Sequence, residues 1–521
     1  MTRPVRLLPA FLTVGVWTLL SRVFGFARDI MIAAFLGAGP AAEAFLIAFA
    51  LPNMFRRFFA EGAFNMAFIP LFSKKVEKGD DAETFARDAA TLLGLILVAL
   101  CALALVFMPA LVLLMASGFA GDERFALAVD MGRVVFPYIL FISLAALLSG
   151  VLNAMGRFWA AAAAPVLLNI VLVAAMGLTA LLGGDVAQAL TWGVPVAGVA
   201  QLAFVWLAAK RAGVTLLPSR PRLTPDLKRL AIIAAPAALA GGVVQVNLLV
   251  GRQVASYFDG AVAWLNYADR LYQLPLGVVG IAIGVVLLPD LSRRLAAGDR
   301  AGGISAINRA AEFSLALTLP AAVALIAIPL PLVAVLFERG AFGPGDSAAT
   351  ALALAIYGLG LPAFVLQKVV QPVFFAREDT RSPFLFALVA MVINAGLAIG
   401  LAPLIGYLAA PVGTTISAWA MLALLLRGAA RIDGGIEPDR RLRRALPRLL
   451  AASLLMGALI WAAAAALATP LATPGLRVAA LAGLVLLGAA TYGAAAFLSG
   501  ALSAADLRRM LRRPRKPAPQ D

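Results

Sequence analysis

Apolar stretches of 20 or more residues recur along almost the whole of this 521-residue chain, and they limit its fold more than any other feature. Each stretch is long enough to cross about 30 Å of hydrocarbon as an α-helix. Only 13% of the residues are charged, whereas an ordinary soluble domain has about 25%. Ten-residue segments of alternating polarity, which a membrane β-barrel would need, do not occur. The sequence therefore predicts an all-α polytopic membrane protein.

Lysine and arginine concentrate in every second connection between the apolar stretches, from Arg3 and Arg6 at the start to 508–516 at the end. Short cytoplasmic loops are enriched in these residues, so both termini are predicted to be cytoplasmic. The net charge of +16 then follows from topology, and no nucleic-acid partner is expected. About fourteen transmembrane helices are predicted. Their ranges are 11–37, 41–72, 85–118, 125–155, 160–183, 186–210, 228–256, 261–292, 304–338, 346–376, 382–402, 405–431, 443–468 and 475–500.

The two halves of the chain align with each other at an offset of about 220 residues. A short motif and a spacing of 32 residues between a proline and an asparagine both recur. They are Pro70–Lys75 with Pro289–Arg294, and Pro137 and Asn169 with Pro362 and Asn394. The alternative is chance similarity between apolar segments. As a repeat, the pattern predicts two six-helix lobes in the same orientation, followed by two extra helices.

This organisation predicts five regions: an N-lobe at 1–210, a cytoplasmic linker at 211–227, a C-lobe at 228–431, a helix pair at 432–500 and a basic cytoplasmic tail at 501–521. Within this pair, residues 451–468 and 478–500 are almost wholly Ala, Leu, Gly and Val, with no interior charge. Small residues allow close helix packing, which explains this composition by itself. A groove for a lipid tail is the functional alternative. The tail is expected to hold the C-terminus at the anionic cytoplasmic leaflet.

Charged side chains cluster inside three of the predicted helices. Such residues are costly in lipid and usually face a protein interior or an aqueous cavity. The clusters are Arg22, Arg28 and Asp29 around Gly25, a candidate bend, in the first helix, Arg56, Arg57 and Glu61 in the second, and Asp269 and Arg270 in the eighth. The charges of the first helix argue against a cleaved signal peptide. Snorkelling or neutralisation by neighbouring acids is the alternative reading of these arginines. This structural reading is preferred for Arg57 and Glu61, which form an i, i+4 pair. For Arg56 the structural and functional readings are equally favoured.

A functional role is favoured for Arg22, Arg28 and Arg270 because they come from both halves of the repeat. Several guanidinium groups around one cavity form an anion site, and their planar donors suit phosphate oxygens. The predicted substrate therefore carries phosphate or pyrophosphate. The chain has no histidine and one cysteine, Cys101, which excludes a His/Cys metal site and a disulfide framework. It also has no GxxxxGK[ST] motif, so ATP hydrolysis and a bound cofactor are not expected.

Three segments resemble the lipid II flippase family, MurJ, also called MviN. They are SRVFGFARD, LPNMFRRFFAEGAFNMAFIP and YADRLYQLPLGVVGIAIGVVLLPDLS. The likeness covers all predicted helices and is strongest in the first, second and eighth. It implies a transporter rather than an enzyme, with two six-helix lobes and alternating access, in a superfamily of multidrug, oligosaccharidyl-lipid and polysaccharide exporters. The implied substrate is lipid II, the undecaprenyl-pyrophosphate-linked precursor of peptidoglycan, flipped across the bacterial inner membrane for cell-wall biogenesis. Membrane lipids and the cell-wall synthesis machinery are the other partners considered.

The resemblance also implies roles for individual residues. Arg22, Arg28 and Arg270 match cavity arginines that receive the pyrophosphate, and Arg56, Asp29 and Glu43 match further polar positions of the cavity or gate. Arg57, Glu61, Asp269, Gln273 and Gly25 complete the set expected to support the cavity or its gating. The final helix pair matches a groove proposed for the polyprenyl tail.

The chain departs from the family in two places. Gln273 stands where many members have a glutamate, so no acid can titrate there. Asn394 and Thr414 match part of a sodium site described in the family, but its expected acid positions hold Gly251 and Ala398. Sodium binding is therefore doubtful from the sequence.

The predicted mechanism begins with an inward-facing cavity that admits the lipid head while the tail stays in the membrane. Arginines neutralise the head, and the lobes rock about the first helix. The membrane potential, worth roughly 2.3 kcal/mol per charge per 100 mV, is a candidate drive. Three alternatives stay open: a flippase for another polyprenyl-pyrophosphate-linked glycan, a drug exporter, and an intramembrane glycosyltransferase. The last would need an external acid, for which the candidates are Asp122, Glu123, Glu338 and Asp346.

Overall fold

The computed structural model describes residues 7–56, 63–216, 219–432 and 437–501. Throughout these ranges the regular secondary structure is helical, with no strand and one isolated β-bridge, between Arg339 and Phe342. The predicted all-α fold is therefore confirmed. Two predicted site residues, Arg57 and Glu61, lie outside the described residues, as does most of the basic tail.

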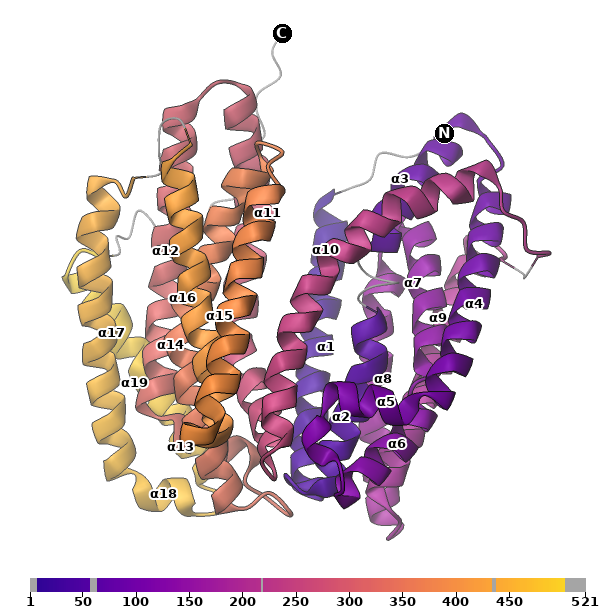
Figure 1. The fold of residues 1–521 in the computed structure, drawn as a ribbon. Helices are drawn as coiled ribbons and strands as arrows, with labels where there is room; N and C mark the ends of the chain where they lie inside the picture. Colours follow the sequence, from indigo (N-terminus) through magenta and orange to yellow (C-terminus); the bar gives the residue numbers. More distant parts are fainter. Residues whose placement is uncertain (1–6, 57–62, 217–218, 433–436, 502–521) are drawn as a thin grey trace. The chain divides into compact units, whose positions relative to one another are not determined.

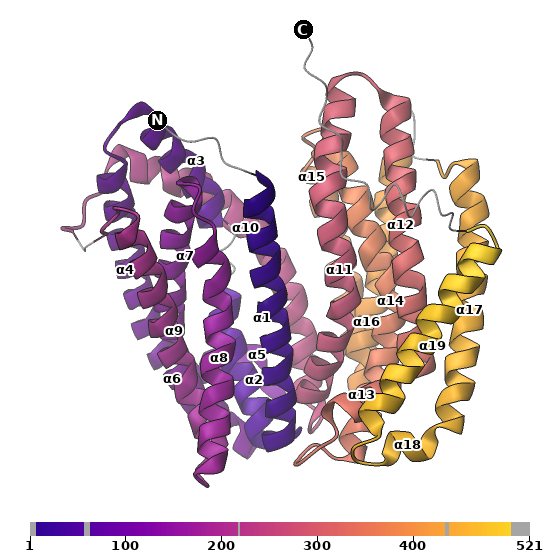
Figure 2. The ribbon, with the colours of Figure 1, turned by 180° about the vertical axis from the view of Figure 1, so that it is seen from behind.

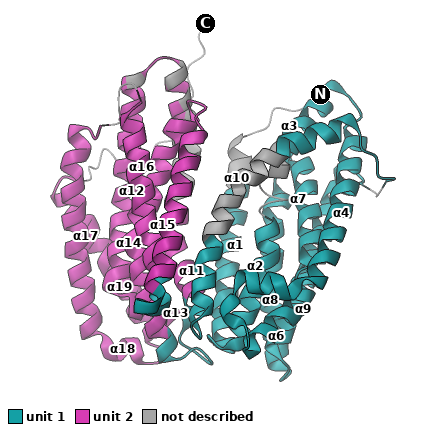
Figure 3. Cartoon of the chain, in the orientation of Figure 1, with its two compact units in different colours: residues 1–264, 337–346, 402–410 teal, residues 265–336, 347–401, 411–521 magenta. Residues whose placement is uncertain are grey.

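The chain forms two compact units, which Figure 3 colours separately. Unit 1 consists of residues 1–264, 337–346 and 402–410, and unit 2 of residues 265–336, 347–401 and 411–521. Helix α10 (Pro225–Ser256), which the repeat assigned to the C-lobe, packs in unit 1 against α3 (Ala63–Lys78) and α4 (Ala82–Val106). The repeat-based lobes and the linker at 211–227 stay predictions.

Unit 1 is built around long helices that pack side by side (Figures 1 and 2). Helix α1 contacts α8, α8 contacts α9, α7 contacts α9, and α2 contacts α6. Large side chains such as Tyr138, Phe45 and Phe68 fill its core. Besides α3, α4 and α10, its elements are α1 (Leu7–Leu36), α2 (Pro40–Arg56), α5 (Met108–Met115), η2 (Ser117–Phe119), α6 (Glu123–Val135), α7 (Tyr138–Ala154), α8 (Trp159–Leu181) and α9 (Val186–Arg211).

Segment 337–346 of unit 1 docks against the C-terminal part of α1. The amide of Ala341 donates to the carbonyl of Ala34 at 2.8 Å. Gly340 has a φ of +58°, and a Cβ there would lie 2.1 Å from the same carbonyl oxygen. Only glycine combines this backbone conformation with such a close approach.

Unit 2 contains most of α11 (Ala261–Ala296), whose first four residues belong to unit 1. Its other elements are α12 (Arg300–Ala327), α13 (Pro329–Phe337), α14 (Pro344–Phe375), α15 (Arg381–Ile405), η3 (Gly406–Leu408), α16 (Ala409–Ala430), α17 (Arg440–Ala466), α18 (Ala468–Ala472) and α19 (Arg477–Leu498), some of which begin or end in unit 1. Helix α17 packs on both α12 and α19 (Figure 2).

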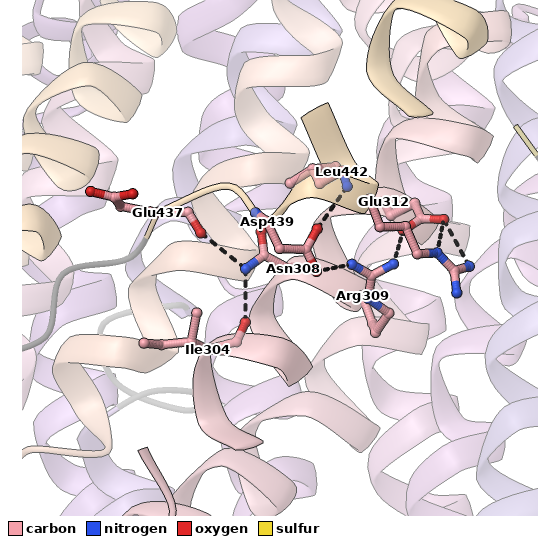
Figure 4. Close-up of polar contacts among 8 residues, drawn as sticks. Ile304, Asn308, Arg309, Glu312, Glu437, Asp439 and Leu442 are labelled. Atoms are coloured by element: carbon pink, nitrogen blue, oxygen red, sulfur yellow. Dashed lines mark hydrogen bonds and ion pairs between the residues drawn. The ribbon is translucent and has the colours of Figure 1, made fainter. Parts of the chain in front are cut away.

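A polar network holds the start of α17 on α12 (Figure 4). Arg309 forms ion pairs with Glu312 and Asp439, and Arg441 reaches Glu312 at 3.0 Å. Asp439 also caps α17 by accepting from the amide of Leu442 at 2.7 Å. These contacts, together with an apolar layer between α12, α17 and α19, position the C-terminal helix pair within unit 2.

Each predicted span coincides with one helix or with two or three consecutive helical elements. Two breaks within spans fall at proline: Pro137 lies between α6 and α7, and Pro329 begins α13 directly after α12. Proline lacks an N–H and crowds the preceding turn, so an apolar pattern alone cannot reveal the break. Within the described ranges, nine helical stretches are long and apolar enough to span a membrane, and one of them, 381–430, covers two predicted spans. The count of fourteen stays a prediction.

Candidate functional site

Arg28 lies on α1 in unit 1 and is only 7% exposed. Its Nε and Nη2 donate to Oδ1 of Asp29 at 3.0 and 2.7 Å. Its Nη1 donates to Oδ1 of Asn169 on α8 at 3.0 Å, and the ring of Phe49 lies 5.7 Å from the guanidinium. The buried charge is thus paired and hydrogen-bonded, as burial of an ion requires.

Asn169 links this arginine to the backbone of α1. Its Nδ2 donates to the carbonyl of Ser21 at 3.1 Å. That carbonyl lies four residues before Gly25, and a Cβ added at Gly25 would lie 3.5 Å from Asn169 Nδ2. Asn169 therefore contacts both the predicted substrate-binding arginine and the predicted bend. The sequence identified Asn169 only as a member of the repeat and not as a site residue.

The other predicted arginines differ in burial. Arg22 is exposed, although it lies on the same helix as Arg28. A separation of six residues, about 600° of turn at 100° per residue, places the two side chains on different sides of α1. Arg56 ends α2 and is half-buried. All three belong to unit 1.

Arg270 and its neighbours lie on α11 in unit 2. Arg270 and Asp269 are half-buried, and the Nε2 of the exposed Gln273 donates to Asp269 Oδ2. Gln273 therefore hydrogen-bonds Asp269. At the position of Gln273, many members of the family were expected to have a glutamate. Because Arg270 belongs to another unit than Arg22 and Arg28, a common cavity for the three stays a prediction.

Glu43 is bound in a second charged cluster of unit 1 and is only 1% exposed. Its Oε2 accepts from Arg124 Nη1 at 2.9 Å, and its Oε1 accepts from the amide of Val262 at 2.9 Å. Arg124, 5% exposed, also contacts Asp122 at 2.6 Å and Asp259 at 2.9 Å. This carboxylate thus ties the start of α2 to the starts of α6 and α11.

A cavity of about 630 Å³ adjoins this cluster. Trp264 and Asp346 line it, and the indole Nε1 of Trp264 donates to Asp346 Oδ1 at 2.8 Å. The amide of Arg124 donates to the Asp122 carboxylate and lowers the pKa of that group below the ordinary aspartate value. Asp122 and Asp346 therefore have structural partners of their own. Arg124, which organises the cluster, was missed from sequence because nothing along the chain connects it with Glu43.

The two weak sodium-site positions lie on neighbouring helices of unit 2. Asn394 of α15 is buried against Gly413 of α16, where an added Cβ would lie 2.8 Å from its Oδ1. The carbonyl of Thr414 accepts from Ser417 Oγ at 2.9 Å. The contact at Gly413 brings the two helices close together.

Comparison with known proteins gives a consistent result. The family model described as lipid II flippase MurJ matches residues 32–476. The probable lipid II flippase MurJ of Rhizobium meliloti is 45% identical over 97% of this chain and 96% of its own length. That of Rhizobium tropici is 43% identical over 98% of both.

Solved structures are similar in fold. One described as lipid II flippase MurJ, inward closed conformation, has a TM-score of 0.78 and 24% identity, covering 96% of this chain and 100% of that chain. An inward-facing multidrug resistance MATE family transporter of the MOP superfamily has a TM-score of 0.67 and 17% identity, covering 81% of this chain and 98% of its own. An outward-facing one has a TM-score of 0.52 and 18% identity, covering 81% and 95%.

Proposed function

This chain belongs to the lipid II flippase MurJ family, and we propose that it moves lipid II from the cytoplasmic to the periplasmic leaflet of the bacterial inner membrane. It is a multi-pass membrane transporter and not an enzyme. Both termini are proposed to lie in the cytoplasm, as the distribution of lysine and arginine indicates. Its product supplies peptidoglycan synthesis, so the enzymes of that process are its proposed functional partners.

The buried Arg28 is the observation that carries the substrate proposal. Guanidinium has five N–H donors, and the contacts with Asp29 and Asn169 use three of them. The remaining donors bond no acceptor in the described part of the chain. A pyrophosphate oxygen would take these donors or replace the Asp29 carboxylate, and arginine's planar fork suits both arrangements. Arg22, Arg56 and Arg270 are proposed as further contacts to the same head group.

The transport cycle is proposed to be alternating access. A transporter of two bundles exposes its central site to one side of the membrane at a time, and the fold of this chain is shared with transporters solved in inward-facing and outward-facing conformations. Glu43 and Arg124 join the ends of several helices at the predicted external side. Their ion pair is therefore proposed as part of the external gate, with Asp269 and Gln273 supporting Arg270.

The final helix pair is proposed to guide the polyprenyl tail. Its mostly Ala, Leu, Gly and Val surface would be compatible with an apolar chain. The network of Arg309, Glu312 and Asp439 holds the pair on α12, so it can move with unit 2 as one body.

Complementation tests this proposal. A strain depleted of its own lipid II flippase would receive wild type, Arg28→Ala, Arg270→Ala or the exposed-site control Arg133→Ala, at matched membrane levels. Growth with wild type and Arg133→Ala, but not with the other two, is the expected result. If well-expressed wild type fails, the substrate is another polyprenyl-pyrophosphate-linked glycan or a different molecule. If Arg28→Ala and Arg270→Ala both rescue, the arginine mechanism is wrong.

A further inference from the structure

An apolar cavity of about 560 Å³ lies between α4, α7 and α9 of unit 1. This volume is within the usual range for ligand sites, about 300–1,000 Å³. Among the residues that line it, Leu147 and Leu148 are buried and form its floor, whereas Leu95 and Val98 at its edge are 49% and 53% exposed. These helices are candidate membrane spans. Exposed apolar side chains on a span face lipid, so the cavity opens toward the bilayer.

The cavity has the length of one membrane leaflet. Along α4 it extends from Ala90 to Val98, a rise of about 12 Å at 1.5 Å per residue. Half of a hydrocarbon core of about 30 Å is about 15 Å. Its lining residues fall in the middle of α4 and in the C-terminal halves of the candidate spans Glu123–Ala154 and Val186–Arg211. The distribution of lysine and arginine predicts that the start of α4 and the ends of the other two spans are cytoplasmic. One acyl chain of the cytoplasmic leaflet would fit this depth, whereas a long polyprenyl tail would extend well beyond it.

Basic side chains gather at the cytoplasmic end of the cavity. Lys210 Nζ lies 5.4 Å from the ring of Trp206, which lines the cavity. The amide of Ser219 donates to Thr91, another lining residue, at 3.0 Å. This contact places the exposed Arg220, the next residue, at the same end.

Arg87 adds a further donor one turn before Thr91. Its Nε is buried and bonds no acceptor in the ranges that the structure describes. The nearby acid Asp88 accepts from Ser219 Oγ at 2.9 Å, so it fixes the connection after α9 to α4. The end of the cavity therefore combines three cations with one acid that is already hydrogen-bonded.

We propose that this cavity binds one acyl chain of an anionic membrane phospholipid from the cytoplasmic leaflet, with the lipid phosphate near Lys210, Arg220 and Arg87. Apolar walls accept the chain, and clustered cations at the leaflet surface favour a negative head group. The bound lipid would fill the space between α4, α7 and α9 and stabilise their packing. This site is separate from Arg28 and does not depend on which lipid the protein transports.

Photo-crosslinking would test the site. The full chain would be placed in phosphatidylcholine nanodiscs with phosphatidylglycerol that carries a diazirine in its acyl chain, and labelled peptides would be mapped. Gly94 lines the cavity and has no heavy atom within 4 Å of an added Cβ, so Gly94→Leu fills the space without a backbone clash. Gly400→Leu is the matched control, because Gly400 on α15 is equally open.

The expected result is labelling of 90–98, 140–148 and 199–206 in wild type and Gly400→Leu. Gly94→Leu should reduce this labelling by about tenfold, since an added side chain in an occupied space excludes the ligand. Equal labelling of all three proteins would overturn the site.

The head group would be tested in the same assay. Lys210→Ala with Arg220→Ala should lower phosphatidylglycerol labelling about fivefold, to the level of a matched phosphatidylcholine probe. The control is Arg431→Ala with Arg440→Ala, two exposed basic residues of unit 2. Equal labelling of wild type by the phosphatidylglycerol and phosphatidylcholine probes would refute the anionic preference. Displacement by a polyprenyl phosphate, but not by phosphatidylglycerol, would show that the cavity holds a substrate tail instead. No arm measures lipid II movement, so these outcomes are independent of the proposed function.

Discussion

Asn169 holds Arg28 through a hydrogen bond of 3.0 Å and at the same time bonds the carbonyl of Ser21, on the same helix as Arg28, at 3.1 Å. The side-chain amide of Asn169 on α8 thereby fixes both the Arg28 side chain and the backbone of α1. Under the proposed function, this arrangement sets the position of the guanidinium that meets the pyrophosphate. Asn169 is then a positioning residue, because it acts through Arg28.

Removal of Asn169 should weaken lipid II binding through Arg28 alone. A hydrogen bond to a charged group contributes about 1.5–3 kcal/mol, so Asn169→Ala should raise the Kd for lipid II about tenfold or more. In an Arg28→Ala background the same substitution should change the Kd little. The measurement is a double-mutant cycle: labelled lipid II is bound in detergent by wild type, Asn169→Ala, Arg28→Ala and the double variant. Equal effects of Asn169→Ala in both backgrounds would show that Asn169 acts independently of Arg28.

Gly25 offers a test of whether α1 bends during transport. An alanine there would meet Asn169 at an ordinary contact distance of 3.5 Å, so Gly25→Ala should stabilise the helix by up to about 1 kcal/mol. If α1 bends at this point, the same change should slow transport. Gly15→Ala, at an open position of the same helix, is the control that should gain stability without losing transport. Thermal unfolding and complementation together decide, and equal transport by both variants would exclude the bend at Gly25.

The Glu43–Arg124 pair should be important for stability. Arg124→Ala leaves a buried carboxylate without its main partner, and such a loss costs about 3–5 kcal/mol. Arg133→Ala removes an exposed pair instead and should cost about 0–1 kcal/mol. Unfolding of the two variants in the same detergent measures the difference. Similar stabilities would mean that the pair is not buried in the protein in solution.

The attachment of α17 to α12 should survive mild acid. Burial opposes ionisation of Asp439, but the amide of Leu442 and the Arg309 guanidinium outweigh it and lower the pKa. A lowered pKa in the folded state means that the stabilisation is present above the unfolded value, about 3.9, and is lost as the pH falls through the folded value. Hydrogen exchange of residues 440–466 should therefore be slow at pH 7 and about pH 5 and faster in Asp439→Asn. Fast exchange of these residues in wild type at about pH 5 would contradict a lowered pKa of Asp439.

Much of the fold could be predicted because long apolar runs mark each helix, and the ranges agree with the helices found. The breaks at Pro137 and Pro329 could not be predicted, because the apolar sequence continues across both of them. Arg28 was recognisable as a charge in an apolar helix. Arg124 was not, because its partners Glu43 and Asp259 are far away in the chain and its own position is the start of a helix. Ion pairs of this kind depend on packing between distant segments, which one sequence does not reveal.

Reconstituted transport of lipid II tests the central claim most directly. Proteoliposomes containing wild type, Arg28→Ala or Arg133→Ala would receive fluorescent lipid II, and its appearance in the opposite leaflet would be followed by quenching. Wild type and Arg133→Ala should move the lipid at equal rates, and Arg28→Ala should be slower by about tenfold or more, the loss expected for one arginine–phosphate contact. Equal rates for wild type and Arg28→Ala, or no movement by wild type, would contradict the account.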